Sequence, residues 1–284
     1  MSIVVTGATG HLGRHVVEQL LEKVPAEQVT AVARSAEKAA DLAERGVRVA
    51  VADYNAPETF DGLFAAGDKV LLISGSEVGS DRVRQHRTVI EAAMAAGVAL
   101  LAYTSAPGTL TAALADDHRA TEELLLASGL PYVLLRNSWY HENYTENLAP
   151  VLAHAAVTHA AGDGRISSAA RADYAAAAVA VLTGEGHENK TYELGGDVAW
   201  SMGEYAAELS RQTGREIAEN AVSEEALTGI LAGAGVPAPF AAVLAGVDTS
   251  IAKGELVVDS GDLSRLAGRP TTPLADAIAA ALKD

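Results

Sequence analysis

The feature that most constrains this chain is the sequence TGATGHLG at residues 6–13, which stands between an apolar run and a helical pattern. Its three glycines are three residues apart. Glycine lets the backbone turn tightly and leaves no Cβ in the way of a pyrophosphate, and the helix that follows offers free N–H groups to phosphate. The spacing predicts a dinucleotide-binding turn; the alternative is a tight turn that binds nothing. The residues of this predicted turn are Gly7, Thr9, Gly10, His11, Leu12 and Gly13.

Short β-branched runs alternate with helical patterns over the first half of the chain. The runs lie at residues 2–5, 29–33, 47–52, 69–74, 98–105 and 131–137, and the helical patterns at 14–24, 82–97 and 117–128. Asp116 or Asp117 is the expected cap of the third helix, and Gly129 its stop. Apolar strands that alternate with helices imply a parallel sheet covered on both faces, so the predicted fold class is α/β, a doubly wound (Rossmann) sheet.

The regular alternation of predicted strands and helices stops after about residue 150, where turn signals and weak strands replace it. We expect a dinucleotide-binding domain at residues 1–150 and a smaller mixed α/β lobe at 151–284. The segment 172–196, with a helical pattern followed by a strand pattern, is expected to return to the first domain.

Composition and charge exclude several classes of protein. The chain has 284 residues and no cysteine, which rules out disulfides, thiolate catalysis and Cys-ligated metals. Its formal charge of −16 disfavours direct contact with nucleic acid. The longest apolar stretches are too short for a membrane helix, and the N-terminus lacks the pattern of a signal peptide, so a cytoplasmic protein is expected. The histidines show no metal-ligand spacing, and no metal is predicted.

The residues after the second predicted strand indicate which dinucleotide binds. An NAD site usually has an acidic residue there for the ribose 2′-hydroxyl, but this chain has Arg34 and Ser35. A guanidinium suits a 2′-phosphate, which favours NADPH, and Arg14 or His11 could assist. The alternative is a solvated arginine at a strand end.

A small polar loop follows the fourth predicted strand. We expect it to lie beside the glycine turn, where the ribose and pyrophosphate of a dinucleotide pass in doubly wound folds, although a plain loop is the competing interpretation. Asp53, after the third strand, could contact adenine or cap the next helix. The residues of the loop are Ser74, Gly75, Ser76 and Glu77.

Together with the glycine motif and "VARS" after the second strand, "LLRNSWYHENY" and "AARADYAAA" resemble the NmrA-like branch of the atypical short-chain dehydrogenases. Within that branch the sequence is most similar to bacterial NAD(P)H:quinone oxidoreductases of the QorB type. The resemblance covers nearly the whole chain. It implies an NADPH-dependent reductase of quinones, in which Arg34 meets the 2′-phosphate and the segment from Asn137 to Asn143 lines the nicotinamide side.

One departure from the wider superfamily bears on mechanism. No tyrosine of this chain has a lysine four residues later, so the usual Tyr-x-x-x-Lys proton donor is absent. Alcohol oxidation is therefore disfavoured, whereas reduction of a quinone gives a stabilised phenolate and demands less of an acid. His118 lies in the corresponding region and is a candidate proton donor, with a solvated histidine as the alternative.

Substrate contacts are expected from the segment after the sixth strand. Trp139 and Tyr140 offer flat faces for a quinone, or simple core packing instead, and Asn137 and Asn143 could donate hydrogen bonds to a quinone carbonyl. In "RADY", Asp173 is expected to cap a helix at 174–183 and Arg171 to pair nearby.

Two hypotheses about activity stay open at this point. One is a quinone reductase, which takes a small-molecule quinone and could form a homodimer. The other is a regulatory protein that senses NADP(H) without turnover, which some NmrA-like relatives exemplify. A reductase of another activated carbonyl or enone is a third, weaker reading.

Overall fold

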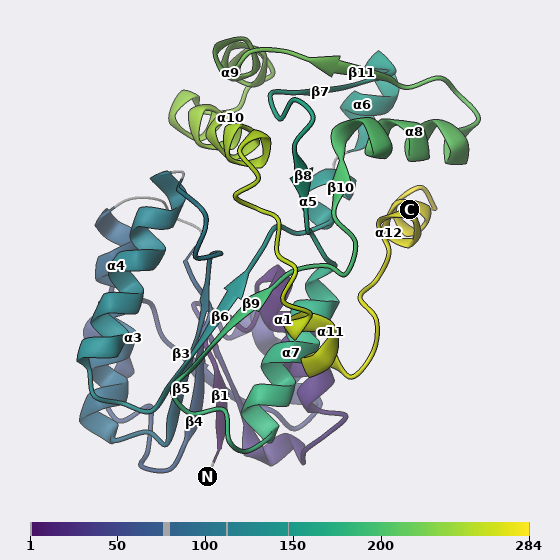
Figure 1. The fold of residues 1–284 in the computed structure, drawn as a ribbon. Coiled ribbons are helices and arrows are strands. Elements are labelled where there is room, and N and C mark those ends of the chain that lie inside the picture. The colour runs from purple at the N-terminus through teal and green to yellow at the C-terminus, as the bar shows by residue number, and fades with distance from the viewer. Residues whose placement is uncertain (1, 76–79, 112, 147, 284) are drawn as a thin grey trace.

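The computed structural model describes residues 2–75, 80–111, 113–146 and 148–283. A sheet with helices on both faces forms the lower part of the molecule in Figure 1, and a smaller lobe of helices and short strands sits above it. The parallel strands of the sheet point their carboxyl ends toward this lobe.

The sheet has seven parallel strands in the order β3-β2-β1-β4-β5-β6-β9. Its order reverses between β1 and β4, which is the topological switch point where doubly wound folds bind ligands. The predicted fold class is confirmed. The strands are β1 (Ile3–Val5), β2 (Val29–Ala33), β3 (Arg48–Val51), β4 (Lys69–Leu72), β5 (Leu100–Ser105), β6 (Tyr132–Asn137) and β9 (Lys190–Leu194).

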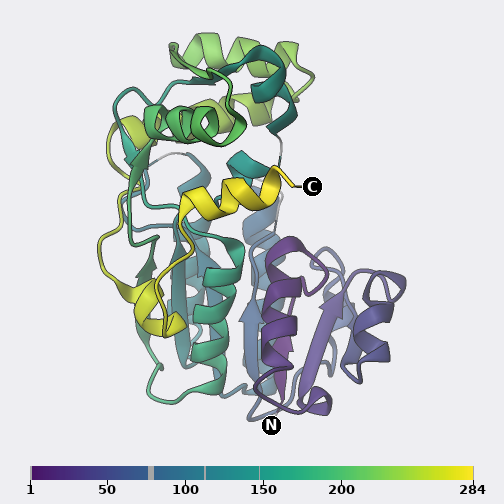
Figure 2. The same cartoon turned by 90° about the vertical axis from the view of Figure 1, so that its right-hand side faces the viewer.

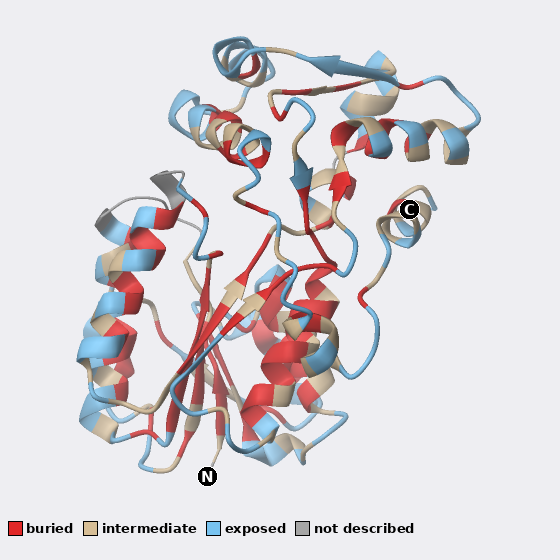
Figure 3. Cartoon of the chain, in the orientation of Figure 1, coloured by how far each residue is buried: buried red, intermediate tan, exposed pale blue. Residues whose placement is uncertain are grey.

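Helices cover the two faces of the sheet, and buried residues lie along the strands and on the helices beside them (Figure 3). These residues form one apolar cluster on each face. One face packs against α1, α7 and α11, with Val16, Tyr174 and Leu263 in its core. The other packs against α3 and α4, with Phe60 and Leu125. The helices of this part are α1 (His11–Leu20), α2 (Ala40–Glu44), α3 (Ser80–Ala96), α4 (Ala113–Ala127), α7 (Arg171–Thr183) and α11 (Asp262–Ala267), with 3₁₀ turns at Ala26–Gln28, Glu37–Ala39 and Pro57–Phe60.

The lobe has a separate apolar core around Trp200, Tyr205 and Ile251. Its strands pair in twos, β7 with β11 and β8 with β10. The C-terminal helix α12 lies beside the lobe in both views (Figure 2). The lobe elements are α5 (Glu142–Thr145), α6 (Leu148–His154), β7 (Ala156–His159), β8 (Arg165–Ile166), β10 (Trp200–Ser201), α8 (Met202–Thr213), β11 (Ala218–Ala221), α9 (Glu224–Gly233), α10 (Ala238–Ala252) and α12 (Leu274–Ala281).

The chain passes repeatedly between the sheet and the lobe. After β6 it enters the lobe, returns through α7 to β9 at the edge of the sheet, and enters the lobe again at β10. It comes back once more at α11, whose Leu263 packs into the core beside α1 and α7. The lobe is therefore tied to the sheet by several crossings.

Two expected helix caps are wrong. The helix α4 begins at Ala113, so Asp116 and Asp117 lie inside its first turns. The helix α7 begins at Arg171, and the buried Asp173 carboxylate accepts hydrogen bonds from the Thr272 backbone N–H (2.8 Å) and hydroxyl (3.2 Å) and pairs with Arg269. Asp173 is thus held by contacts with the C-terminal segment, which no local pattern reveals, whereas Asp116 pairs with Arg119 of its own helix.

Among the described residues, none of the helices is long and apolar enough to cross a membrane.

Candidate active site

Each of the three glycines in the turn is needed for a different structural reason. Gly7 has a φ of +62°, a left-handed conformation that side chains disfavour. Gly10 is exposed and forms the N-cap of α1. A Cβ at Gly13 would lie 2.2 Å from the Gly7 carbonyl oxygen, so the first turn of α1 packs directly on the turn backbone. Gly7 and Gly13 thus determine the path of the backbone in the turn. Gly10 leaves the exposed side of the turn without a side chain.

The start of α1 is suited to an anion. No side chain caps this helix, and its first turn carries no acidic residue. The leading amides of α1, at Leu12 and Gly13, therefore stand at the positive end of the helix dipole, beside the bare Gly10. A pyrophosphate fits this position because it needs N–H donors and close approach to the backbone.

The loop after β2 places Arg34 on the surface, with its side chain exposed. Arg14 is already engaged: it donates to the Lys38 carbonyl oxygen (2.7 Å) and to the Asp41 carboxylate (3.1 Å). The ion pair raises the pKa of Arg14 and lowers the pKa of Asp41. Arg14 therefore fixes α2 beside α1, and Arg34 is the better placed of the two to read a 2′-phosphate.

The loops after β3 and β4 differ in what they offer a ligand. The Asp53 carboxylate accepts from the Asn55 backbone N–H (2.8 Å) in a local turn, and no side chain caps the following 3₁₀ turn at Pro57–Phe60. Ser74 donates its N–H to the Thr104 hydroxyl (2.9 Å), beside the switch point. Ser76 and Glu77 lie outside the described residues.

A cavity of about 150 Å³ lies between the carboxyl ends of β4 to β6 and the lobe. Predicted residues from the ends of two strands and from the helix α4 come together there, Ser74, His118 and Tyr140 among them. Arg82 and Leu256 also line it, and the sequence reasoning missed both. The described lining residues are Ser74, Arg82, Thr104, Ser105, Ala106, Pro107, Leu110, His118, Asn137, Ser138, Trp139, Tyr140 and Leu256.

Asn137 and Tyr140 form a polar and aromatic wall of this cavity. The Asn137 side-chain N–H donates to the Tyr140 hydroxyl (3.3 Å), while its carbonyl oxygen is buried with no partner among the described residues. A buried acceptor without a donor is costly, which suits a ligand that brings an N–H or O–H group. The Tyr140 ring is held between Tyr174, edge-on at 5.2 Å, and the Arg171 guanidinium, also 5.2 Å from its centroid.

Trp139 lines the cavity and packs against the lobe core. Asn143 is different: it is exposed on α5, where it accepts from Arg171 (3.4 Å), and it is not among the described lining residues. Arg171 also pairs with Glu146. Asn143 thus contacts the residue that supports Tyr140 and does not face the cavity.

His118 is buried, so the interpretation as a solvated histidine is wrong. Its Nδ1 lies 2.8 Å from the Tyr103 hydroxyl, and its Nε2 lies 3.5 Å from the Arg82 guanidinium. Burial, and next the charge of Arg82, lower the pKa of His118 to about 3. The imidazole is neutral at physiological pH and is a poor proton donor there.

A second buried histidine, His86, supports the loop after β4. Its Nε2 accepts the Gly75 backbone N–H (2.9 Å), so the ring proton is on Nδ1 and faces the Thr121 hydroxyl (2.9 Å). Burial is the main cause that lowers the pKa of His86 to about 3, followed by His118 and Arg82. No local pattern indicates this contact, because it depends on how α3 packs against the loop.

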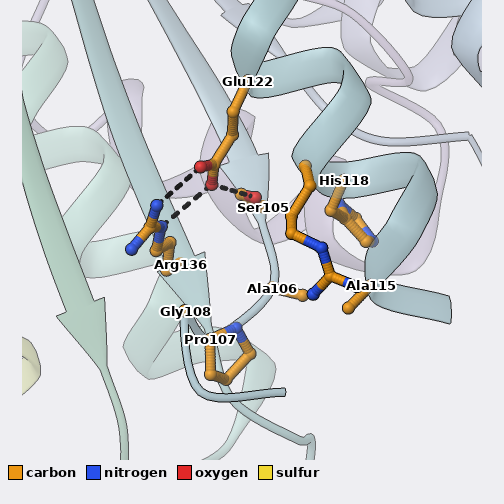
Figure 4. Close-up of a pocket in the computed structure, with 9 residues that line it drawn as sticks. Ser105, Ala106, Pro107, Gly108, Ala115, His118, Glu122 and Arg136 are labelled. Atoms are coloured by element: carbon orange, nitrogen blue, oxygen red, sulfur yellow. Dashed lines mark hydrogen bonds and ion pairs between the residues drawn. The ribbon is translucent and has the colours of Figure 1, made fainter. Parts of the chain in front are cut away.

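A smaller cavity of about 60 Å³ adjoins the first and shares Ser105 and His118 with it. Figure 4 shows the Glu122 side chain reaching from α4 to Arg136 and Ser105. Ser105 donates to Glu122 (2.5 Å), and Arg136 donates two hydrogen bonds to the same carboxylate (2.9 and 2.6 Å). Glu122 is thus held in an ion pair.

The turn, the bare helix start and the cavity at the switch point define a dinucleotide-binding α/β protein. Residues 7–185 match the family described as NAD(P)H-binding. A near full-length relative carries the NmrA-like family domain: the oxidoreductase flvB of Aspergillus flavus is 30% identical, over 98% of this chain and 94% of its own. The chain therefore belongs to the NAD(P)H-binding, NmrA-like family.

Reductases are among the most similar relatives. Quinone oxidoreductase 2 of Escherichia coli is 47% identical over 278 residues, 97% of each chain. The crystal structure of NADPH-dependent quinone oxidoreductase QOR2 from the same organism, complexed with NADPH, has a TM-score of 0.95 and 46% identity over 99% of this chain and 100% of that one. Triphenylmethane reductase of Citrobacter has a TM-score of 0.94 and 41% identity over all of both chains.

The contact at Gly13 yields a stability prediction. We expect Gly13→Ala to lower the free energy of unfolding by about 3 kcal/mol, because the new methyl group must displace backbone. Gly229→Ala on α9, where no atom lies within 4 Å, is the matched control and should leave stability unchanged or raise it by up to about 1 kcal/mol. Urea unfolding measures both. Equal effects would contradict the packing role of Gly13.

The neutral state of His118 can be tested by NMR. Because burial and Arg82 hold its pKa near 3, we expect its ring signals to stay constant from pH 5 to 8. The variant His118→Gln identifies those signals, and the protein unfolded in urea provides the reference titration near pH 6.5. A midpoint near neutral pH in the folded protein would restore His118 as a candidate acid.

The two buried histidines also predict how stability depends on pH. Below about pH 6.5 the unfolded chain binds protons at His86 and His118, whereas the folded chain does not until about pH 3. Through their titration, stability should therefore fall as the pH drops from 6.5 toward 3, by roughly 1.4 kcal/mol per pH unit for each histidine. Urea unfolding of wild type and His86→Gln measures the slope, which should be shallower in the variant.

Proposed function

We propose that the protein is an NADPH-dependent reductase that transfers a hydride to a quinone. The observation that carries the proposal is the cavity of about 150 Å³ beside the switch point, lined by Trp139, Tyr140 and the unpartnered Asn137 oxygen. Its position is where a doubly wound fold presents the reactive end of a dinucleotide. The near full-length relatedness to quinone oxidoreductase 2 supports the same function.

The residues present fit NADPH. The bare Gly10 and the uncapped start of α1 would hold the pyrophosphate, and the exposed Arg34 would hold the 2′-phosphate. The buried Asn137 oxygen could accept a hydrogen bond from the carboxamide of the nicotinamide. When bound, the cofactor supplies the hydride; the protein binds it and orients its reactive ring.

A quinone suits the other wall of the cavity. Trp139 and Tyr140 present aromatic side chains to a flat ring, and Tyr140 is held in place by Tyr174 and Arg171. The site lacks the Tyr-x-x-x-Lys pair, and its histidine is neutral. A substrate that accepts a hydride and leaves as a stabilised anion fits such a site better than an alcohol does.

The function can be tested by following NADPH oxidation at 340 nm with 1,4-benzoquinone. We expect enzyme-dependent turnover with one NADPH consumed per quinone reduced. The rate of NADPH oxidation with a triarylmethane dye under the same conditions would be compared with the rate with 1,4-benzoquinone, because the dye is a second class of hydride acceptor. Tight NADPH binding without turnover across a panel of quinones would instead support the sensor hypothesis.

The role of Arg34 predicts a change of cofactor preference. We expect Arg34→Glu to weaken NADPH binding by about 10- to 100-fold, because a charge-assisted hydrogen bond to phosphate is lost, and to leave NADH binding within a few-fold. Arg45→Glu makes the same charge change at the exposed C-terminal end of α2 and is the control. Fluorescence titration measures all three proteins. Equal losses for both dinucleotides would show that Arg34 does not read the 2′-phosphate.

A further inference from the structure

Arg82 is an unexpected member of the cavity wall. It lies in the first turn of α3, is only 4% exposed, and lines the cavity together with His118 and Asn137. All the other described lining residues are neutral at physiological pH, so Arg82 carries the one permanent charge among them. A buried cation beside a cavity of neutral groups makes the potential inside it more positive, and the Asp117 carboxylate 3.9 Å from the guanidinium offsets part of that charge.

The neighbours of Arg82 hold it in place without adding a second cation. The Asp117 carboxylate of α4 lies 3.9 Å from the guanidinium, and the His118 Nε2 lies 3.5 Å away. Burial lowers the pKa of Arg82, while Asp117 and next Tyr103 raise it; an arginine stays charged in such a balance. His86 and His118 are neutral, partly because Arg82 disfavours their charged forms.

The same groups supply no proton near neutral pH. His118 is unprotonated, and burial raises the pKa of Tyr140. Glu122 is tied to Arg136 on the far side of Ser105. Among the described residues that line the cavity, Arg82 favours negative charge, and none is an acid of matched pKa that could neutralise it.

We propose that Arg82 is a catalytic residue that stabilises the oxygen anion formed on the quinone during hydride transfer, and that a proton from solvent neutralises this anion afterwards. The inference rests on the proposed function. In the balanced reaction, a hydride, which is one proton with two electrons, would pass from C4 of the dihydronicotinamide to the neutral quinone and leave NADP⁺ and a hydroquinone monoanion. One proton from water then gives the hydroquinone.

A spectroscopic test measures, without turnover, how strongly the cavity stabilises a bound phenolate. 4-Nitrophenol resembles the anionic product in size, and its phenol and phenolate forms absorb differently. In the complex of enzyme, NADP⁺ and 4-nitrophenol, we expect Arg82→Gln to raise the apparent pKa of the bound phenol by about 1–2 units, a 10- to 100-fold loss of phenolate stabilisation. Arg87→Gln, an exposed arginine of the same helix, should leave it unchanged. An unchanged value in both variants would overturn the proposal.

A kinetic test uses single turnover of NADPH-loaded enzyme with 1,4-benzoquinone. We expect Arg82→Gln to slow hydride transfer about 100-fold in the folded, NADPH-loaded protein, with NADPH affinity close to wild type. The rate of hydride transfer in Arg82→Lys should lie between the rates of the wild type and Arg82→Gln, because lysine keeps the charge and loses the planar geometry. A loss in Arg82→Gln no greater than in Arg87→Gln would refute the role of Arg82.

The wild-type enzyme provides an independent test that needs no variant. NADPH deuterated at C4 should slow the single turnover, while D₂O should leave its rate nearly unchanged, because the proton arrives after the hydride. A solvent isotope effect above about 2 would show that a proton moves in the same step and would overturn the proposal. Absence of turnover with any quinone, while NADPH still binds, would instead refute the proposed function itself.

Discussion

The close approach of α1 to the first glycine of the turn is the contact on which the site depends. Because Gly13 lets the helix rest on the Gly7 carbonyl oxygen, the uncapped start of α1 lies at the sheet edge, beside the switch point. A side chain at that position would push the helix away and misplace the amides. Three other parts of the fold then form the remainder of the site beside those amides. They are the loop after β4, the end of β6, and the lobe that the chain enters next.

A cluster of buried polar groups, two of which line the cavity, sets its electrostatics. The Gly75 N–H fixes the tautomer of His86, and Tyr103 and Arg82 contact His118. These groups are satisfied by each other, which makes their burial tolerable and the cavity rigid. Rigidity matters for the proposed chemistry, since a preorganised charge costs little reorganisation when the anion forms.

Much of the fold could be predicted because its signals are local. β-Branched runs mark the strands, and TGATGHLG marks the dinucleotide turn; Asn137, Trp139 and Tyr140 were also expected in the site. Arg82 could not be found in this way, because an arginine near the start of a helix usually faces water. Its burial depends on how α3 packs against α4, a contact between segments that are distant in sequence. The docking of α11 on α7 and the partners of Asp173 escaped prediction for the same reason.

The most direct measurement is a crystal structure of the protein with NADP⁺ and 4-nitrophenol. We expect the pyrophosphate at the start of α1, the 2′-phosphate near Arg34, and the phenolate oxygen within hydrogen-bond distance of Arg82, with the phenol ring stacked on the nicotinamide in the cavity. A nicotinamide ring outside the cavity, or a phenolate oxygen directed away from Arg82, would contradict this account.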